Sequence, residues 1–151
     1  MWRTAFAIAT AATIAAASGV AFAGSAETIK LSARMDARQV VPQKPKGNVA
    51  RARGTFTGTL GGSGSARKLS WEITYQNLDH PSIVVADIHY GKRGKFGPVI
   101  VRLCGPCKTG RHGTTKVKAS WVPAIKAGNS FVTLITGKNP NGEVRGQIRA
   151  G

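Results

Sequence analysis

Acidic residues are scarce in this 151-residue chain, which has 6 Asp+Glu against 22 Lys+Arg and a formal net charge of +16 at pH 7. The sequence also lacks a glycine period and a G-x-S-x-G segment, which argues against a collagen-like chain and against a serine-hydrolase elbow. Charged residues make up 19% and Gly occupies 19 positions, a balance that argues against a coiled coil. What is present is one domain's length of chain with 42% hydrophobic residues, enough for a packed core.

Residues 1–23 have the pattern of a secretory signal peptide. Arg3 gives a cationic start, an apolar stretch follows at 5–17, and Ala21-Phe22-Ala23 forms a small-residue cleavage site. Cleavage there leaves 128 residues, 24–151, with a net charge of +15. No later segment has about 18 consecutive apolar residues, so no transmembrane anchor is expected. We therefore expect an exported protein, periplasmic or extracellular, in a compartment where disulfides persist.

Alternation of apolar and polar residues dominates the rest of the chain. Ile29, Leu31, Ala33 and Met35 alternate with polar residues, as half-buried strands do. Further strands are predicted at 56–60, 69–75, 83–90, 98–103, 116–121, 131–136 and 143–149. Hairpin loops are predicted at 61–65 and 139–142, and one short helical turn near 122–127. The pattern indicates an all-β protein of about eight antiparallel strands, arranged as a sandwich or barrel.

Three segments of the second half resemble the CHRD (chordin) domain. Segments 86–91 (ADIHYG), 97–103 (GPVIVRL) and 139–148 (NPNGEVRGQI) are similar to the family patterns A-H-I-H-x-G, G-x-V-V-x-L and N-P-x-G-E-I-R-G-Q-L. The positions that carry the resemblance are Ala86, Ile88, His89, Gly91, Asn139, Pro140, Gly142, Glu143, Arg145, Gly146 and Gln147. The first half of the chain also fits the family, but less specifically. Together the two halves extend the resemblance over Ile29 to Arg149 of a single domain, 24–151.

The resemblance implies an exported, single-domain protein of a family without an established catalytic activity. In animal chordin the repeats belong to a secreted antagonist of bone morphogenetic proteins. With the strand pattern, it leads us to expect an immunoglobulin-like or superoxide-dismutase-like antiparallel β-sandwich. Two positions depart from the family pattern: Asp87 replaces the first His of A-H-I-H, and Ile135 replaces the His of a Y-V-x-V-H-T strand. A role that depends on those two imidazoles is therefore in doubt.

Two pairs of polar residues are spaced to share one face of a strand. Asp87 and His89 alternate with apolar neighbours that suit the core, which predicts that the pair lies on the outer face or at a sheet end. The pair is either hydrogen-bonded to a neighbouring segment or, with His112, part of a metal site; a copper site would need more imidazoles than the 3 His supply. Glu143 and Arg145 are expected to form a structural ion pair, worth about 0 to 1 kcal/mol at a surface.

Cys104-Gly105-Pro106-Cys107 is the sharpest local motif. Export and an even number of cysteines favour a short-range disulfide. A zinc half-site would need two more ligands, with His112 and either His89 or Asp87 as candidates. A thioredoxin-type pair would need to begin a helix, whereas a glycine-rich loop follows here. Free thiols are the fourth alternative.

Basic residues concentrate where acids are missing. The span from Ile88 to Gly142 contains no acid, and a second basic group precedes Gly54. Nucleic-acid binding would require exposed aromatics for stacking, but Trp71, Tyr75 and Phe131 lie in predicted strands, so no specific nucleic acid is expected. Anionic envelope polymers, acidic polysaccharides or lipid head groups are better partners, and a charge that serves solubility alone is the alternative. The candidate anion-binding residues are Lys92, Arg93, Lys95, Lys108 and Arg111.

The leading hypothesis is a non-catalytic binding or structural module that uses its basic face and needs no cofactor. The alternative from a different class is a metal-binding or redox protein, holding zinc or copper, that would use Asp87, His89, Cys104, Cys107 and His112. Convergence of these five side chains in space would distinguish the two hypotheses.

Overall fold

The computed structural model describes residues 26–79, 81 and 84–151, so the predicted signal peptide and His80 lie outside the described residues. The predicted all-β architecture is confirmed, and none of the helices in the described part is long and apolar enough to cross a membrane. The strands are β1 (Ile29–Asp36), β2 (Arg53–Gly61), β3 (Ala66–Gln76), β4 (Val84–Tyr90), β5 (Val99–Cys104), β6 (Arg111–Lys118), β7 (Ser130–Thr136), β8 (Val144–Gln147) and β9 (Arg149–Ala150). The helical elements are the 3-10 turns η1 (Ala37–Gln39) and η2 (Ala119–Trp121) and the short helix α1 (Val122–Lys126).

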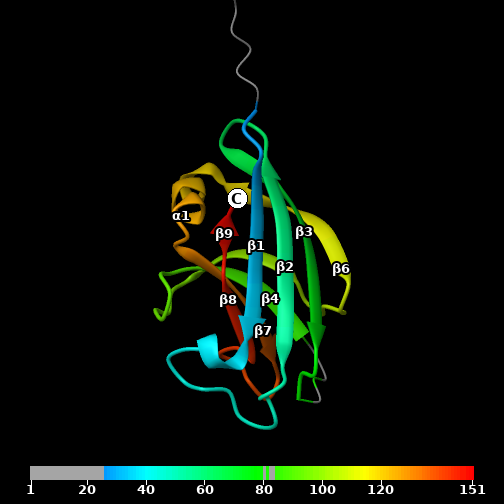
Figure 1. Ribbon diagram of the computed structural model, residues 1–151. Coiled ribbons are helices and arrows are strands. Elements are labelled where there is room, and N and C mark those ends of the chain that lie inside the picture. The colour runs from blue at the N-terminus through cyan, green and yellow to red at the C-terminus, as the bar shows by residue number, and fades with distance from the viewer. Residues whose placement is uncertain (1–25, 80, 82–83) are drawn as a thin grey trace, which may run out of the picture.

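The strands form one antiparallel sheet in the order β5-β4-β7-β8-β1-β2-β3-β6, with β9 paired to β1. The sheet folds over on itself, so that β1, β2 and β3 form one layer and β4 and β7 cross behind them (Figure 1). The two ends of the order, β5 and β6, come within contact distance of each other, which makes the molecule nearly barrel-shaped. A sheet closed in this way has few exposed edges for other chains to pair with.

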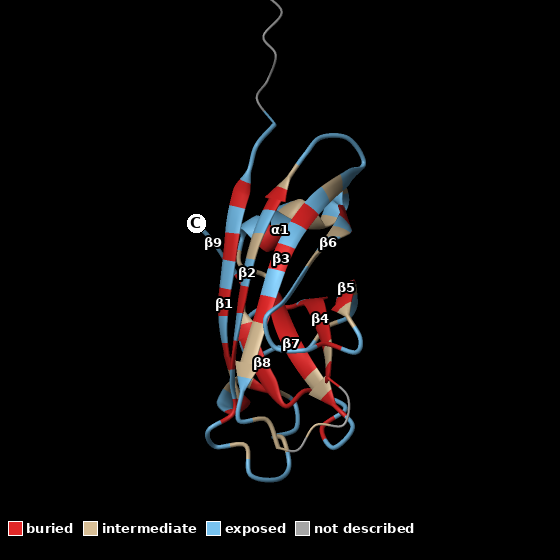
Figure 2. Ribbon diagram, turned by 90° about the vertical axis from the view of Figure 1, so that its right-hand side faces the viewer, coloured by how far each residue is buried: buried red, intermediate tan, exposed pale blue. Residues whose placement is uncertain are grey.

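The core lies between the two layers. In β1, β2 and β3 buried residues alternate with exposed ones, whereas β4 and β7 are buried along almost their whole length (Figure 2). Phe56, Leu69, Ile73, Ile88 and Leu134 are among the fully buried side chains of the core. Burial of a residue of this size contributes about 1.5 to 3 kcal/mol. The alternating sequence pattern therefore predicted the half-exposed layer of β1, β2 and β3 correctly. Both faces of β4 and β7 are covered.

One predicted strand was misplaced. The pattern at 116–121 predicted a strand, but β6 runs from Arg111 to Lys118 and is followed by η2. The inward positions of β6 include Gly113 and Thr115 because Trp71 of β3 fills the space opposite: a Cβ on Gly113 would lie 2.7 Å from the Trp71 ring, and Trp71 Nε1 donates to Thr115 Oγ1 at 3.0 Å. Because the Trp71 indole fills the space beside β6, the inward positions of β6 do not need apolar side chains, and the start of this strand lacks the alternating pattern.

Cys104 and Cys107 form a disulfide, as the export context had favoured. The backbone of this loop bonds to strands on both sides of the place where the sheet closes. Cys107 N donates to Val84 O at 2.7 Å, and Tyr75 Oη donates to Cys107 O at 3.0 Å. Gly110 N also donates to Ile73 O at 2.9 Å. The loop between β5 and β6 therefore links β4 to β3.

Candidate functional site

Asp87 and His89 share the outer face of β4, as predicted, but a loop covers that face and both side chains are buried. Their exposed fractions are 1% and 6%. Asp87 forms an ion pair with Arg102 of the neighbouring strand β5. His89 is covered by the loop 91–97, which packs against outward side chains of β4, β7 and β8. The sequence pattern of β4 shows which of its residues face the core, but it does not show that a loop covers the opposite face.

Under this loop lies a buried cluster outside the main core. The rings of His89 and Phe131 are stacked with centroids 4.8 Å apart and an interplanar angle of 9°. The guanidinium of Arg145 lies over the Phe131 ring, with Cζ 3.5 Å from its centroid. Phe96, from the loop itself, places its ring 6.0 Å from that of His89. Aromatic and cation–π contacts of this kind contribute about 0.5 to 2 kcal/mol each.

Three side chains of the cluster hold the loop by its backbone carbonyls. Gln147 Nε2 donates to Gly91 O at 2.8 Å, and Arg145 Nη2 donates to Lys92 O at 3.2 Å. His89 Nδ1 lies 2.9 Å from Gly97 O and must donate to it, since a carbonyl can only accept. Both ends of the loop are thereby fixed to the sheet.

Burial lowers the pKa of two members of the cluster, His89 and Arg145. Desolvation lowers the pKa of His89 below its ordinary value of 6.5, with smaller lowering from Arg145 and Arg102, against the raising influence of Gly97 O and Asp87. Desolvation, with the nearby charge of Arg93, lowers the pKa of Arg145 to about 10. His89 Nε2 has no hydrogen-bond partner among the described residues. His89 is therefore neutral at neutral pH, while Arg145 keeps its charge.

The five residues of the metal or redox alternative have other partners or positions. The two sulfurs are joined in the disulfide, so neither is a thiolate ligand. His112 lies on β6, paired in register with Glu72 of β3. Nowhere in the described ranges do three or more His, Cys, Asp and Glu side chains gather as a metal site. The described residues therefore do not bring the five side chains together as a ligand set.

Glu143 does not pair with Arg145, contrary to expectation. Its carboxylate is fully buried and accepts hydrogen bonds from Thr136 Oγ1 at 2.8 Å, Asn139 Nδ2 at 3.2 Å and the backbone N of Asp79 at 2.5 Å. It therefore organises the β7–β8 hairpin and ties that hairpin to the segment after β3. The following residues of the motif pack closely too, since a Cβ on Gly146 would lie 2.5 Å from Arg34 O.

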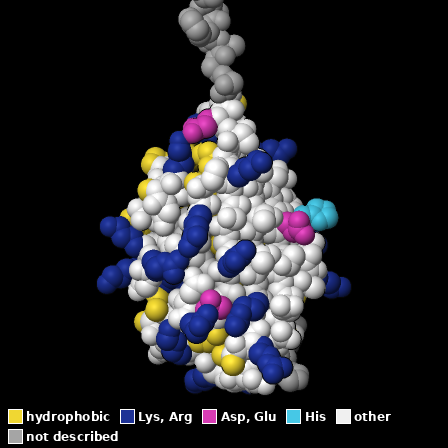
Figure 3. Space-filling view, in the orientation of Figure 1, with side chains coloured by type: hydrophobic (Ala, Val, Ile, Leu, Met, Phe, Trp, Pro, Cys, Tyr) yellow, Lys and Arg dark blue, Asp and Glu magenta, His cyan; other side chains and the backbone are white. Residues whose placement is uncertain are grey.

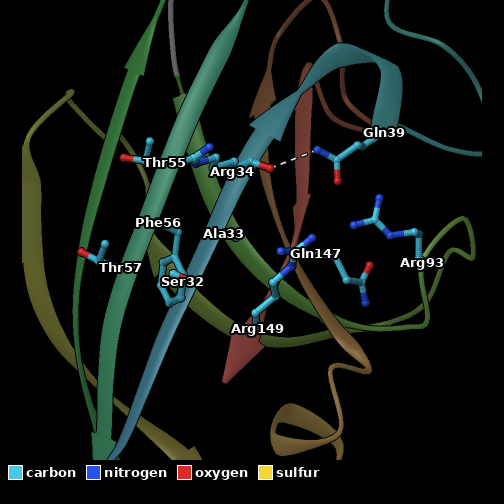
Figure 4. A pocket seen from close by; sticks show the side chains of 10 residues that line it. All are labelled: Ser32, Ala33, Arg34, Gln39, Thr55, Phe56, Thr57, Arg93, Gln147 and Arg149. Atoms are coloured by element: carbon cyan, nitrogen blue, oxygen red, sulfur yellow. Dashed lines mark hydrogen bonds between the residues drawn. The ribbon is translucent and has the colours of Figure 1, made fainter. Parts of the chain in front are cut away.

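Next to the buried cluster is an open groove of about 700 Å³. It is lined by Ser32, Ala33, Arg34, Gln39, Thr55, Phe56, Thr57, Arg93, Gln147 and Arg149. Arg149 points across the groove toward Arg93, whereas Arg34 lies over β1 and β2 beside Thr55 (Figure 4). The groove thus presents three guanidinium groups with hydroxyl and amide groups between them.

Within the described part of the chain, no carboxylate forms an ion pair with the arginines of the groove. Its lining includes no Asp or Glu, and none of the ion pairs found among the described residues involves Arg34, Arg93 or Arg149. Lys and Arg side chains are spread over the face that carries β1, with few acidic side chains among them (Figure 3). One guanidinium group can donate two parallel hydrogen bonds to two oxygens of a carboxylate, phosphate or sulfate, so this lining suits an oxyanion.

Of the five candidate anion-binding residues, only Arg93 lines the groove. Lys92 and Lys95 lie in the same loop, and Lys108 and Arg111 lie at the connection from β5 to β6. Arg34 and Arg149 were missed as site residues. They meet because Arg149 pairs in register with Ser32, two residues before Arg34, and the outward positions of β1 and β9 share one face. Pairing of the first and last strands is a long-range property that alternation does not encode.

The segments that build the covered cluster and the groove are also those that carry a family signature. The model of the CHRD domain matches residues 31–148, most of the chain. The chain belongs to the CHRD family. No curated protein and no solved structure is significantly similar to it. In this CHRD domain the motif residues His89, Arg145 and Gln147 hold a loop, and Asn139 and Glu143 build a hairpin.

Proposed function

We propose that this CHRD domain is an exported, non-catalytic binding module whose groove holds the anionic groups of an envelope or extracellular polymer. The observation that carries the proposal is the presence of three arginines in one groove without a carboxylate in its lining. Each arginine can contribute charge-assisted hydrogen bonds, about twice as strong as neutral ones. The disulfide and the signal-peptide pattern support export, because disulfides persist mainly outside the cytoplasm.

Retention on immobilised polyanions tests the proposal. The probes are a carboxylated polysaccharide, a sulfated polysaccharide and a polyphosphate, each compared with a neutral polysaccharide at low and high salt. We expect binding to at least one polyanion that weakens steeply with salt, and none to the neutral polymer. Absence of retention on all three polyanions at low salt would overturn the proposal.

A matched pair of variants separates the groove from diffuse charge. The groove variant Arg34→Gln, Arg93→Gln, Arg149→Gln removes three charges, and so does the control Lys108→Gln, Arg111→Gln, Lys116→Gln, whose residues do not line the groove. We expect the groove variant to bind at least about tenfold more weakly than the control, a difference of about 1.4 kcal/mol. Equal weakening of both variants would mean that net charge, rather than the groove, attracts the polymer.

A further inference from the structure

Exposed large hydrophobic side chains gather in one short segment of the described chain. Tyr90, Phe96 and Val99 have exposed fractions of 40%, 57% and 48%, and they are the large apolar residues that stand out as exposed. All three fall within the segment 90–99, which comprises the end of β4, the connection and the start of β5, and which we call the 90–99 loop. Alternation along β4 places the Tyr90 side chain on the face opposite His89, where its ring lies 5.6 Å from that of Trp121, so Phe96 and Val99 are the apolar side chains on the His89 side. Single exposed apolar residues are ordinary, but a local concentration of them marks an interaction surface.

The 90–99 loop is held in a fixed conformation. Besides the side-chain bonds to its carbonyls, Tyr90 N donates to Pro98 O at 2.9 Å, Gly91 N to Asn129 O at 3.0 Å and Lys95 N to Lys92 O at 3.0 Å. The Phe96 ring lies beside the His89 ring of the buried cluster, with centroids 6.0 Å apart. The exposure of Phe96 therefore belongs to a loop tied to the sheet at several points. The loop projects from the side of the sheet below α1 (Figure 1).

The same loop is strongly basic. Lys92, Arg93 and Lys95 are exposed, and no acidic residue occurs from Ile88 to Gly142. A protruding aromatic ring flanked by lysines is a poor fit for a dry protein interface, whose buried centre is depleted of lysine. It fits a bilayer surface, where an aromatic ring enters the boundary between head groups and acyl chains while lysines contact anionic head groups.

We propose that the 90–99 loop docks the protein on an anionic lipid bilayer. Phe96 enters the interface together with Val99, whose register partner His89 lies beside the Phe96 ring, and Lys92 and Lys95 contact the lipid phosphates. This surface is separate from the groove: apart from Arg93, its residues do not line the groove. The two sites share Arg93, but the docking proposal does not rest on the groove, because Phe96, Lys92 and Lys95 do not line it.

Co-sedimentation with vesicles tests the docking surface. The folded mature protein, without the predicted signal peptide, is mixed with vesicles of phosphatidylcholine alone or of phosphatidylcholine with phosphatidylglycerol. We expect binding to the vesicles that contain phosphatidylglycerol and little to the others. Phe96→Ala should lower the partition coefficient about tenfold, from the loss of one buried aromatic side chain. Phe96→Trp should retain binding, since an indole also suits the interface.

A charge-matched comparison separates docking from general attraction. Lys92→Gln, Lys95→Gln should weaken binding about 30-fold, because each of the two lysines contacts the anionic surface. The control Lys116→Gln, Lys118→Gln removes the same charge from β6 and should weaken binding much less. Circular dichroism and thermal unfolding establish that each variant is folded.

Three results would overturn the docking proposal. They are no binding to the anionic vesicles at low salt, wild-type binding by a folded Phe96→Ala variant, and equal weakening by the two lysine pairs. The last would show that the vesicles attract the whole basic surface. The groove proposal would survive each of these outcomes, because its test uses polymers and different residues.

Discussion

Arg145 lies over the ring of Phe131, with its Cζ 3.5 Å from the ring centroid, and its Nη2 donates to Lys92 O. The charge of this motif arginine is thus buried against an aromatic face and supports a loop, and it is not part of the solvent-facing positive charge of the groove. A planar guanidinium can stack and donate at the same time, which an ammonium cannot do.

Replacement of Arg145 by Lys should destabilise the protein although the charge is kept. We expect the free energy of unfolding to fall by about 1 to 3 kcal/mol, from the lost stack and the lost hydrogen bond to Lys92 O. Urea unfolding followed by circular dichroism measures the change. The control Arg149→Lys, at an exposed groove position, should leave stability nearly unchanged. Equal stability of the two variants would contradict the structural role assigned to Arg145.

The stability of the protein should fall as the pH drops below about 6.5, because of His89. The pKa of His89 is lowered in the fold by burial, so the unfolded chain takes up the proton first. The stabilisation is complete above the unfolded pKa and is lost as the pH falls from there toward the folded pKa. Asp87, Arg145 and Arg102 are the charged groups that act on the ring, and Nε2 has no described acceptor for a second proton.

Unfolding free energies measured between about pH 7 and about pH 5 check this expectation. His89→Gln should remove most of the slope in that range, because a neutral amide replaces the imidazole. His112→Gln on β6 is the matched control and should keep the slope. A wild-type stability that is constant over this range, or a slope that His112→Gln abolishes, would show that His89 is not the responsible group.

Much of the fold could be predicted from the sequence, because in one layer the alternating pattern matches the alternating burial. Ile29 to Met35 in β1 and Leu69 to Ile73 in β3 are buried at every second residue, as predicted. The predicted hairpin loops and the helical turn at α1 are also present. The pattern failed at Gly113 of β6, where the Trp71 ring takes the place of an apolar side chain.

The sites were harder to predict, because they depend on which distant segments meet. The pairing of Asp87 with His89 on one face was predicted correctly, but the burial of that face depends on a loop that returns over it. Arg93 was identified from the local charge density, whereas Arg34 and Arg149 become neighbours only through the pairing of β1 with β9. The ion pair expected for Glu143 was replaced by hydrogen bonds within a hairpin, because Glu143 precedes β8 and its side chain turns inward.

Glu143→Gln should destabilise the protein strongly, although the two side chains have nearly the same size. Three donors, Thr136 Oγ1, Asn139 Nδ2 and Asp79 N, point at the two carboxylate oxygens, and the amide nitrogen of Gln would replace one acceptor by a donor. A buried donor facing another donor costs about 1 to 3 kcal/mol. Thermal unfolding measures the loss, with Glu27→Gln at an exposed position as the control. A loss no larger than that of the control would refute the role of Glu143 in the hairpin.

Removal of the disulfide should loosen the contact between β4 and β3 without preventing folding. The loop between Cys104 and Cys107 is short, with a sequence separation of 3, so the chain-entropy contribution is about 2 kcal/mol. Cys107 N and Cys107 O still bind Val84 and Tyr75 after both cysteines are changed to Ser, which is why we expect the fold to persist. Hydrogen exchange should be faster at the amides of positions 107 and 110. The exchange rates of the β1–β2 amides should rise only by the amount that the lower free energy of global unfolding accounts for. An unchanged exchange rate at Cys107 and Gly110 would mean that the backbone bonds alone hold the closure between β5 and β6.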